Sequence, residues 1–260
     1  MGPDMGRSEG VVPMSSEVGS HWFEPMADHM GSAYLRYSFT KGTVQEVDHI
    51  ISMLDLKPGM RVLDVGCGPG RHAYEFARRG ISVHGIDISQ TFVDLASDAA
   101  PKGATFERMD ARALTFDAEF DAAVCLCQGA FGLMTANGQD VDVLKGIRRA
   151  LKDGGGLALS AFNAYFVVKY FEQATFDAGS GVNHEVTEIR NQAGESQTVD
   201  LWTGCYTPRE LRLMLSACDF EPHSISSVDP GGYVEGPATT ESSEFLVVAF
   251  ATPVRRMGTR

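Results

Sequence analysis

Several features that mark particular protein classes are missing from this sequence. The 260 residues include only five cysteines, an odd number that offers no disulfide framework and is typical of a reduced compartment. Neither a C-x-x-C pair nor a histidine pair has zinc-ligand spacing, so we expect no metal site. No apolar run reaches membrane-spanning length, and residues 1–20 lack the apolar core and basic start of a signal peptide. We therefore expect a cytoplasmic protein without a membrane partner.

Positively charged residues are also scarce. Lysine and arginine number 22 against 34 aspartate and glutamate residues, which gives a formal net charge of -12 and a pI near 5.0. Proteins that bind nucleic acid usually carry a basic surface, so we expect no nucleic-acid partner. Hydrophobic residues make up 43% of the chain, which indicates a globular protein, and the length suits one α/β domain with additions.

The most informative segment covers residues 61–71, RVLDVGCGPGR. Its apolar, β-branched beginning predicts a buried parallel strand. Gly66, Gly68 and Gly70 then predict a loop, and helical spacing follows in HAYEFARRG. In such a strand–loop–helix unit, backbone N–H groups face a ligand that approaches closely because the glycines have no side chain. The segment therefore predicts a ligand-binding turn.

Two acidic residues suggest which ligand this turn binds. Asp64 ends the strand, where it would repel a pyrophosphate but attract an ammonium group. A second predicted strand, SVHGIDIS, ends at Asp87, where a carboxylate can accept hydrogen bonds from a ribose. The glycine spacing is G-x-G-x-G rather than the G-x-G-x-x-G of dinucleotide-binding folds. These features fit S-adenosylmethionine, which has both an amino group and a nucleoside.

With these motifs, the chain resembles the class I S-adenosylmethionine-dependent methyltransferases over roughly residues 43–253. The resemblance implies that the glycine loop and Asp64 hold the methionine part of the cofactor and that Asp87 binds the ribose hydroxyls. Ile88 would pack on the adenine, and Asp110 with Ala111 would lie near the adenine amino group. The complete set of expected cofactor residues is Tyr34, Tyr37, Phe39, Asp64, Gly66, Cys67, Gly68, Gly70, Asp87, Ile88, Asp110, Ala111, Cys127 and Gln128.

Strand and helix patterns alternate along the chain and predict an α/β fold. We expect a Rossmann-like, doubly wound sheet of seven strands, mostly parallel with the last strand antiparallel. The expected divisions are a disordered tail (1–18), an N-terminal helical lid (19–58), a cofactor-binding core (59–162), an inserted roof (163–206), the C-terminal part of the core (207–253) and a tail (254–260).

Three helix starts have capping signals. Thr43 is predicted to cap the helix that follows it, with Glu46 completing a capping box. Ser89 is predicted to cap the helix after the second strand. Thr207 precedes Pro208 and stands three residues before Glu210, which predicts a second capping box.

Two segments outside the alternating pattern are candidates to cover the site. The N-terminal aromatic and methionine stripe predicts either a helix packed on the domain edge or a lid over the cofactor, with Tyr34, Tyr37 and Phe39 at the methionine end. Strand-like runs on both sides of Ala193 and Gly194 predict an antiparallel hairpin. By analogy with the family, this hairpin would roof the site.

Catalytic residues are harder to identify than cofactor residues. Methyl transfer is an in-line displacement in which the enzyme mainly aligns the reactants and excludes water. We expect the two hairpin residues His184 and Glu185 to accept the proton in catalysis. Tyr206 is a further catalytic candidate. The expected substrate contacts are His21, Trp22, Phe131 and Trp202.

We therefore expect a methyltransferase that acts on a small molecule, such as a specialised metabolite, with an oxygen, nitrogen or carbon nucleophile. A homodimer is also expected. One alternative is a nicotinamide-dependent oxidoreductase, which the glycine spacing, Asp64 and the lack of a Tyr-x-x-x-Lys pair disfavour. The other alternative is a protein that binds the cofactor but serves a role other than methylation.

Overall fold

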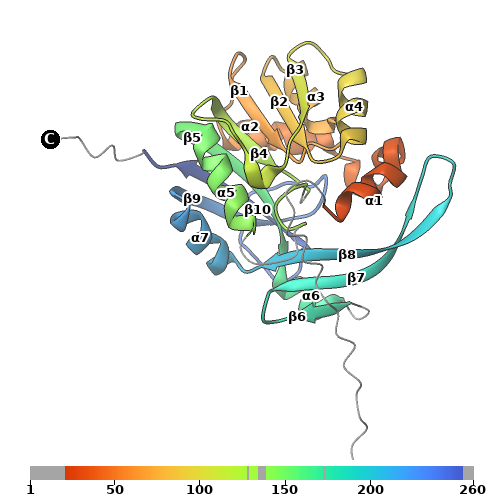
Figure 1. The fold of residues 1–260 in the computed structure, drawn as a ribbon. Coiled ribbons are helices and arrows are strands. Elements are labelled where there is room, and N and C mark those ends of the chain that lie inside the picture. Colours follow the sequence, from red (N-terminus) through yellow and green to blue (C-terminus); the bar gives the residue numbers. More distant parts are fainter. Residues whose placement is uncertain (1–20, 128, 134–138, 172–173, 254–260) are drawn as a thin grey trace, which may run out of the picture.

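The computed structural model describes residues 21–127, 129–133, 139–171 and 174–253 (Figure 1). The two predicted tails, 1–18 and 254–260, lie outside these residues, as does Gln128. No helix in the described part of the chain combines the length and apolar character needed to cross a membrane.

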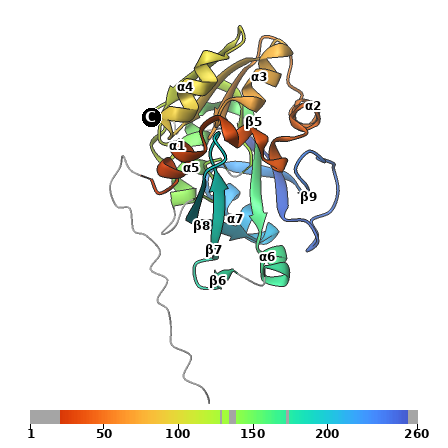
Figure 2. The same cartoon turned by 90° about the vertical axis from the view of Figure 1, so that its right-hand side faces the viewer.

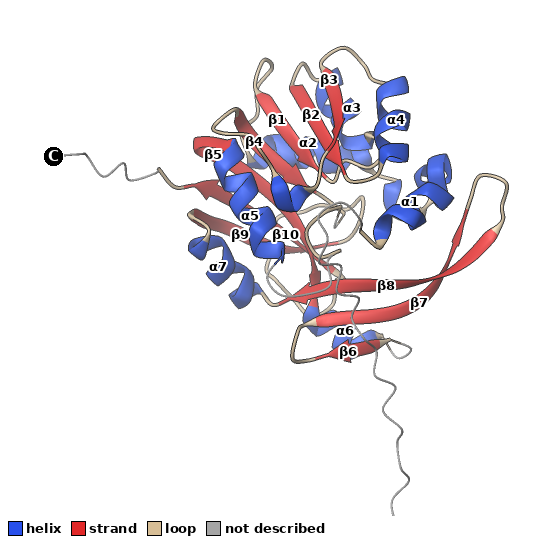
Figure 3. Ribbon diagram, in the orientation of Figure 1, coloured by secondary structure: helices blue, strands red, loops and turns tan. Residues whose placement is uncertain are grey.

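Seven strands form the central sheet, as predicted. Its order is β3-β2-β1-β4-β5-β10-β9, with β1 to β5 parallel and β10 antiparallel to both of its neighbours (Figure 3). Parallel strands place their carboxyl ends at one edge, and an antiparallel strand begins at that same edge. The strands are β1 (Arg61–Val65), β2 (Ser82–Asp87), β3 (Ala104–Arg108), β4 (Phe120–Cys125), β5 (Leu151–Asn163), β9 (Phe220–Val228) and β10 (Glu244–Ala251).

Helices cover both faces of this sheet, which confirms the doubly wound arrangement. One buried cluster joins the strands to α5 and α7, and a second joins them to α2 and α3. The residues that the strands and helices bury against each other are mainly aliphatic, which is typical of a sheet covered on both sides. The helices are α2 (Thr43–Met53), α3 (Arg71–Arg78), α4 (Gln90–Asp98), α5 (Gln139–Ala150) and α7 (Pro208–Ala217), with a short 3-10 turn η3 (Ala111–Ala113).

A second group of strands is inserted after β5, and it contains the predicted hairpin. Strands β7 and β8 pair antiparallel along their whole length and turn at Ala193 and Gly194. The hairpin joins the central sheet at its base, where Phe162 pairs with Cys205 and Asn163 with Tyr206. The elements of this insertion are α6 (Ala164–Tyr170), β6 (Thr175–Asp177), β7 (Val182–Arg190) and β8 (Ser196–Tyr206).

The N-terminal segment lies against the free end of the hairpin. It consists of α1 (Phe23–Met30) and the 3-10 turns η1 (Gly31–Arg36) and η2 (Ser38–Thr40). Both views place α1 beside the hairpin (Figures 1 and 2). Met26, Met30, Phe92 and Ile189 share an apolar cluster that joins α1, α4 and β7. The N-terminal apolar stripe is therefore packed, and it contacts both α4 and the hairpin strand β7.

The capping box predicted at Thr43 is wrong. Thr43 is the first residue of α2 and Gly42 is the N-cap, with no side-chain cap. The Glu46 carboxylate is fully buried and bonded to Arg71 and His72 instead. The tertiary partners of Glu46 therefore outweigh the local motif.

The two other predicted caps are confirmed. The Ser89 hydroxyl accepts a hydrogen bond from the Phe92 N–H at the start of α4. Thr207 and Glu210 form a capping box at the start of α7, with Pro208 in the first turn.

Gly42 provides a test of how tightly the backbone is packed near α2. Its φ is 106°, and an added Cβ would lie 2.3 Å from the Gly231 Cα, whereas Gly194 has φ 84° with nothing within 4 Å. We expect Gly194→Ala to lower the free energy of unfolding by about 1–2 kcal/mol through backbone strain alone. Gly42→Ala should cost about 3 kcal/mol or more, because overpacking adds to that strain. Urea denaturation measures both values, and equal losses would contradict the close contact.

Candidate functional site

Two adjoining cavities open at the carboxyl edge of the sheet. The smaller has a volume of about 40 Å³ and the larger about 310 Å³. They share wall residues from the glycine loop, the end of β2, α1 and the loop after β4, so they lie side by side. The shared residues are Phe23, Gly66, Asp87, Gly129 and Leu133.

The glycine loop has the backbone conformation that the sequence predicts. Gly66, Gly68 and Gly70 have φ values of 71°, 53° and 83°. A Cβ on Gly66 would lie 2.3 Å from the Gly129 carbonyl carbon, so the loops after β1 and β4 are in backbone contact. A Cβ on Gly68 would lie 3.7 Å from the Tyr34 ring. A side chain at Gly66 would force the two loops apart at the centre of the site.

Asp87 lies where the two cavities meet. Its side chain is 4% exposed, and its two carboxylate oxygens accept hydrogen bonds of 2.9 Å from the Gly68 and Ser89 N–H groups. Burial raises the pKa of Asp87 to about 6, although these backbone hydrogen bonds oppose the shift. Each oxygen has a further acceptor position, so the carboxylate can bind two hydroxyl groups of a ligand.

Asp64 lies beneath the glycine loop and lines neither cavity. It is 1% exposed, and its Oδ2 has no hydrogen-bond partner among the described residues. Burial raises the pKa of this carboxyl from 3.8 to about 7, while the charge of Arg71 opposes the rise. A buried carboxylate that lacks a partner is costly, and a cation bound at the loop would lower that cost.

The small cavity collects three of the predicted adenine contacts. Ile88, Asp110 and Ala111 all line it, together with His21. The pKa of His21 is lowered to about 4, mainly by burial, so this side chain is neutral at neutral pH. Asp110 forms a salt bridge of 2.6 Å with Arg112, which turns the Asp110 carboxylate toward its own loop.

The large cavity collects the three aromatic residues predicted at the methionine end. Tyr34, Tyr37 and Phe39 line it, and the ring centroids of Tyr34 and Phe39 are 5.3 Å apart. The Tyr37 hydroxyl accepts a hydrogen bond of 3.0 Å from the Arg190 N–H of the hairpin. Cys127, after β4, forms part of the same cavity wall. These rings therefore separate the site from the hairpin end.

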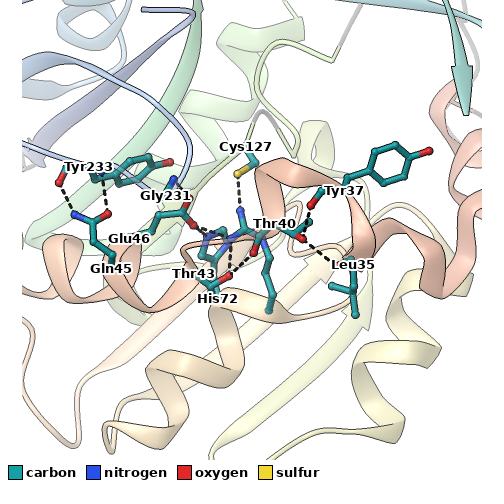
Figure 4. Close-up of polar contacts among 11 residues, drawn as sticks. Leu35, Tyr37, Thr40, Thr43, Gln45, Glu46, His72, Cys127, Gly231 and Tyr233 are labelled. Atoms are coloured by element: carbon teal, nitrogen blue, oxygen red, sulfur yellow. Dashed lines mark hydrogen bonds and ion pairs between the residues drawn. The ribbon is translucent and has the colours of Figure 1, made fainter.

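A buried ionic network supports the wall around Cys127 (Figure 4). Arg71 donates hydrogen bonds of 2.7 Å to Glu46, to Thr43 and to the Cys127 sulfur. His72 lies 2.8 Å from the same Glu46 carboxylate oxygen, and burial lowers the pKa of His72 to about 4. Burial alone would raise the pKa of Glu46, but the hydrogen bond from His72 and the charge of Arg71 lower it.

The predicted catalytic residues on the hairpin lie elsewhere. His184 stacks on Trp202 with ring centroids 4.9 Å apart, and its Nε2 is 2.8 Å from Asp200. Trp22 packs edge-on against Trp202, with centroids 5.6 Å apart. Glu185 is on the same strand as His184, and none of these residues lines either cavity. A role in catalysis or substrate binding stays a prediction for each of them.

Four further predicted residues are part of the surrounding core. Tyr206 stacks on Phe131 with centroids 4.7 Å apart and donates a hydrogen bond to Asp140. Cys67 and Gly70 are buried within the loop, and a Cβ on Gly70 would clash with neighbouring side chains. These four positions support the site without lining the cavities.

Some wall residues were missed from the sequence. Glu244, the first residue of β10, is 6% exposed and lines the large cavity with Phe162 and Thr203. An acid at the start of an antiparallel final strand is a signal that could have revealed Glu244, because that end lies at the ligand-binding edge. No cluster of three or more metal-ligating side chains occurs within the described residues.

Comparison with known sequences gives consistent relatives. A family model described as "Methyltransferase domain" matches residues 62–155. The cypemycin N-terminal methyltransferase of a Streptomyces species is 30% identical over 207 residues, which cover 73% of this chain and 82% of that protein. The putative methyltransferase YqeM of Bacillus subtilis is 31% identical over 119 residues, 45% of this chain and 48% of that protein. The chain thus matches about half the length of YqeM.

Solved structures share the fold. The CcbJ methyltransferase from Streptomyces caelestis superposes with a TM-score of 0.71 at 16% identity, over 87% of this chain and 98% of that chain. CalS10 from Micromonospora echinaspora, solved with S-adenosylmethionine bound, has a TM-score of 0.56 at 21% identity and covers 85% of this chain and 96% of that chain.

The raised pKa of Asp64 predicts how the free energy of unfolding depends on pH. The folded protein holds the Asp64 proton more tightly than the unfolded chain, so this group favours folding below pH 3.8 and loses that contribution as the pH rises through about 7. Asp64→Asn removes the titration. We therefore expect the variant to be more stable than the wild type at pH 8, by up to about 4 kcal/mol for a shift of about three pKa units.

Urea denaturation of the ligand-free protein at pH 5, 6.5 and 8 measures this difference. The advantage of Asp64→Asn should grow steadily with pH. The exposed substitution Asp98→Asn serves as a control and should show no such trend. A variant that is equally stable or less stable than the wild type at pH 8 would contradict the assignment of Asp64 as a buried, poorly compensated carboxylate.

Proposed function

The chain belongs to the class I S-adenosylmethionine-dependent methyltransferases, and from this premise we propose that it methylates a small-molecule acceptor held in the large cavity. The observation that carries this proposal is that the two cavities lie side by side and share Asp87 and the glycine loop as walls. One cavity has the walls expected around an adenine, and the other is large enough for an acceptor beside the cofactor's methionine end. Family membership also disfavours the nicotinamide-dependent alternative.

The residues fit the cofactor on two independent observations. Gly66 and Gly68 have left-handed backbone conformations, and an added side chain would either clash or enter the cavity. Within the described residues, the buried Oδ2 of Asp64 has no hydrogen-bond partner, so a positive charge bound at the glycine loop would be favoured. We assign the adenine to the wall formed by Ile88 and Ala111, and the ribose hydroxyls to Asp87. The cofactor supplies a methyl group activated by its sulfonium.

The remaining work of the protein is positioning and the exclusion of water. The aromatic residues of the N-terminal segment and the apolar residues of the hairpin line the large cavity, which limits the water around an acceptor. Backbone contact between Gly66 and Gly129 fixes the cofactor loop relative to the loop after β4. An acceptor held between these rigid walls gains the alignment that an in-line displacement requires.

The ribose assignment can be tested with Asp87→Asn. The amide keeps the shape of the side chain and one acceptor oxygen but removes the charge. Because hydrogen bonds to a charged group contribute about 1.5–3 kcal/mol, we expect the affinity for S-adenosylhomocysteine to fall about 10- to 100-fold in titration calorimetry. The exposed substitution Asp94→Asn, on α4, is the matched control and should leave the affinity unchanged.

Two results would reject the proposal. Unchanged affinity in Asp87→Asn would remove the ribose site from Asp87. Stabilisation of the wild type by NADH but not by S-adenosylhomocysteine in thermal unfolding would reject the cofactor. Incubation with methyl-labelled cofactor and a panel of metabolites then tests the transfer itself, because label in no acceptor would favour a protein that uses the fold without methylation.

A further inference from the structure

We propose that the acceptor is an uncharged molecule with a large apolar body, which lies between the N-terminal segment and the hairpin. The inference rests on the proposed function, because it names the class of molecule that the large cavity receives. It follows from the apolar side chains that line this cavity and from the partners that the protein itself gives to the charged groups at its wall.

Most of the described side chains that line the large cavity are apolar or aromatic, and they come from separate parts of the chain. Tyr37 and Phe39 belong to the N-terminal segment, Phe162 to the end of β5, and Ile189 and Leu201 to the hairpin. A ligand in this cavity therefore meets apolar surface from more than one element. Because the removal of apolar surface from water is favourable in proportion to its area, a large apolar body gains most from such a site.

The polar atoms of this part of the wall suit an uncharged molecule. The Tyr37 hydroxyl already accepts a hydrogen bond of 3.0 Å from the Arg190 N–H, and its ring stacks on Phe39 with centroids 5.7 Å apart. Two threonines, Thr187 and Thr203, also line the cavity. Their hydroxyl groups can donate to or accept from a neutral polar atom of an acceptor.

The guanidinium of Arg71 reaches the wall at Cys127, but its charge is balanced within the protein (Figure 4). Arg71 donates hydrogen bonds of 2.7 Å to the Cys127 sulfur and to the Glu46 carboxylate. Burial alone would raise the pKa of Glu46, but its bonds to His72 and Arg71 lower it, so the carboxylate is ionised at neutral pH. Burial raises the pKa of Cys127 to about 12. At this point the wall therefore presents an uncharged thiol that is supported by a balanced ion pair.

The three carboxylates that line the cavity also have partners. Asp87 accepts hydrogen bonds from two backbone N–H groups, and Glu188 forms a salt bridge of 2.9 Å with Arg190. Glu244 interacts with another group of the protein and is not free. Transfer of an ion from water into a buried cavity is costly unless a counter-ion is available there. A cation would compete with these existing partners and an anion would be repelled by the carboxylates, whereas an uncharged acceptor meets neither obstacle.

Three probes with a common body test the charge of the acceptor. At pH 7, 4-butylbenzyl alcohol is neutral, 4-butylbenzylammonium is a cation and 4-butylbenzoate is an anion. We expect the wild type, saturated with S-adenosylhomocysteine, to bind the alcohol at least about tenfold more tightly than either ion, because each ion must give up its hydration. Ligand-observed NMR measures the three dissociation constants.

A second series tests the apolar body. From 4-methylbenzyl alcohol to 4-butylbenzyl alcohol, each added CH₂ group should raise the affinity about two- to fourfold. Leu201→Asn nearly preserves the size of a side chain at the cavity but makes it polar, so it should lower the affinity for 4-butylbenzyl alcohol about tenfold. Its affinity for S-adenosylhomocysteine should stay within about twofold of the wild type, because the change leaves the glycine loop and Asp87 intact.

Two further variants complete the experiment. Leu213→Asn makes the same exchange at a leucine on α7 that is 61% exposed, and it should change neither affinity. Phe39→Asn alters the cavity wall from the N-terminal segment and should also lower the affinity for 4-butylbenzyl alcohol about tenfold. Thermal unfolding shows which variants fold, and Phe39→Asn keeps the inference testable if Leu201→Asn does not.

The possible outcomes separate this inference from the proposed function. Failure of the wild type to bind S-adenosylhomocysteine would overturn the proposed function. Binding of S-adenosylhomocysteine by a protein that binds either ion as tightly as the alcohol would overturn only the inference of an uncharged acceptor. Affinities that do not depend on chain length, or folded wall variants with unchanged affinity for the alcohol, would overturn it as well. A preference for the alcohol that grows with chain length and falls in Leu201→Asn would support it.

Discussion

The buried carboxylate of Glu46 joins the segments that surround the ligand-binding turn. Arg71 follows the glycine loop directly and bonds to one oxygen of Glu46, while the other oxygen accepts a hydrogen bond from the Gly231 N–H. Arg71 also holds the Cys127 sulfur, so α2, α3, the loop after β4 and the loop before β10 meet at one ion pair. Removing one partner of such a pair leaves a buried charge, which typically costs about 3–5 kcal/mol. The geometry of both cavities depends on this junction.

Other buried carboxylates lie at the carboxyl edge of the sheet. Two of them have a raised pKa, whereas the pKa of Glu46 is lowered. Asp64, Asp87 and Glu244 are all at least nine-tenths buried, and burial raises the pKa of both Asp64 and Asp87. A core optimised for stability would replace these groups with apolar side chains. Their concentration at the carboxyl edge of the sheet fits a role in ligand binding better than a role in stability.

The sequence predicted the parts of the site that depend on local backbone and on strand order. The glycine loop requires left-handed conformations at neighbouring positions, and Asp87 ends a strand at the edge where the loop lies, so both were visible without tertiary information. Glu46 was misread because its capping motif is local, whereas Arg71 and His72, which bind it, come from another helix. Glu244 was missed although the last strand was predicted to be antiparallel, because the register that sets Glu244 opposite Phe162 joins residues far apart in the sequence. The register between distant segments cannot be read from short-range patterns.

The position of the hairpin depends on contacts between residues far apart in the sequence. The prediction placed His184 and Glu185 toward the cavity, whereas Thr187, Glu188 and Ile189, nearer the free end of the same strand, line it. Within the described part of the chain, two register pairs join the hairpin to the central sheet, so its base is fixed and its free end is held by other contacts.

Those contacts come from the N-terminal segment. The Tyr37 hydroxyl accepts a hydrogen bond from Arg190, and Ser32 donates one to Gln192. Exposed hydrogen bonds of this kind contribute only about 1 kcal/mol each. The apolar cluster that packs Met26 and Met30 against Ile189 adds to these hydrogen bonds, so both polar and apolar contacts hold this boundary. Because each of these two elements positions the other, the wall that they give the large cavity depends on contacts between segments far apart in the sequence.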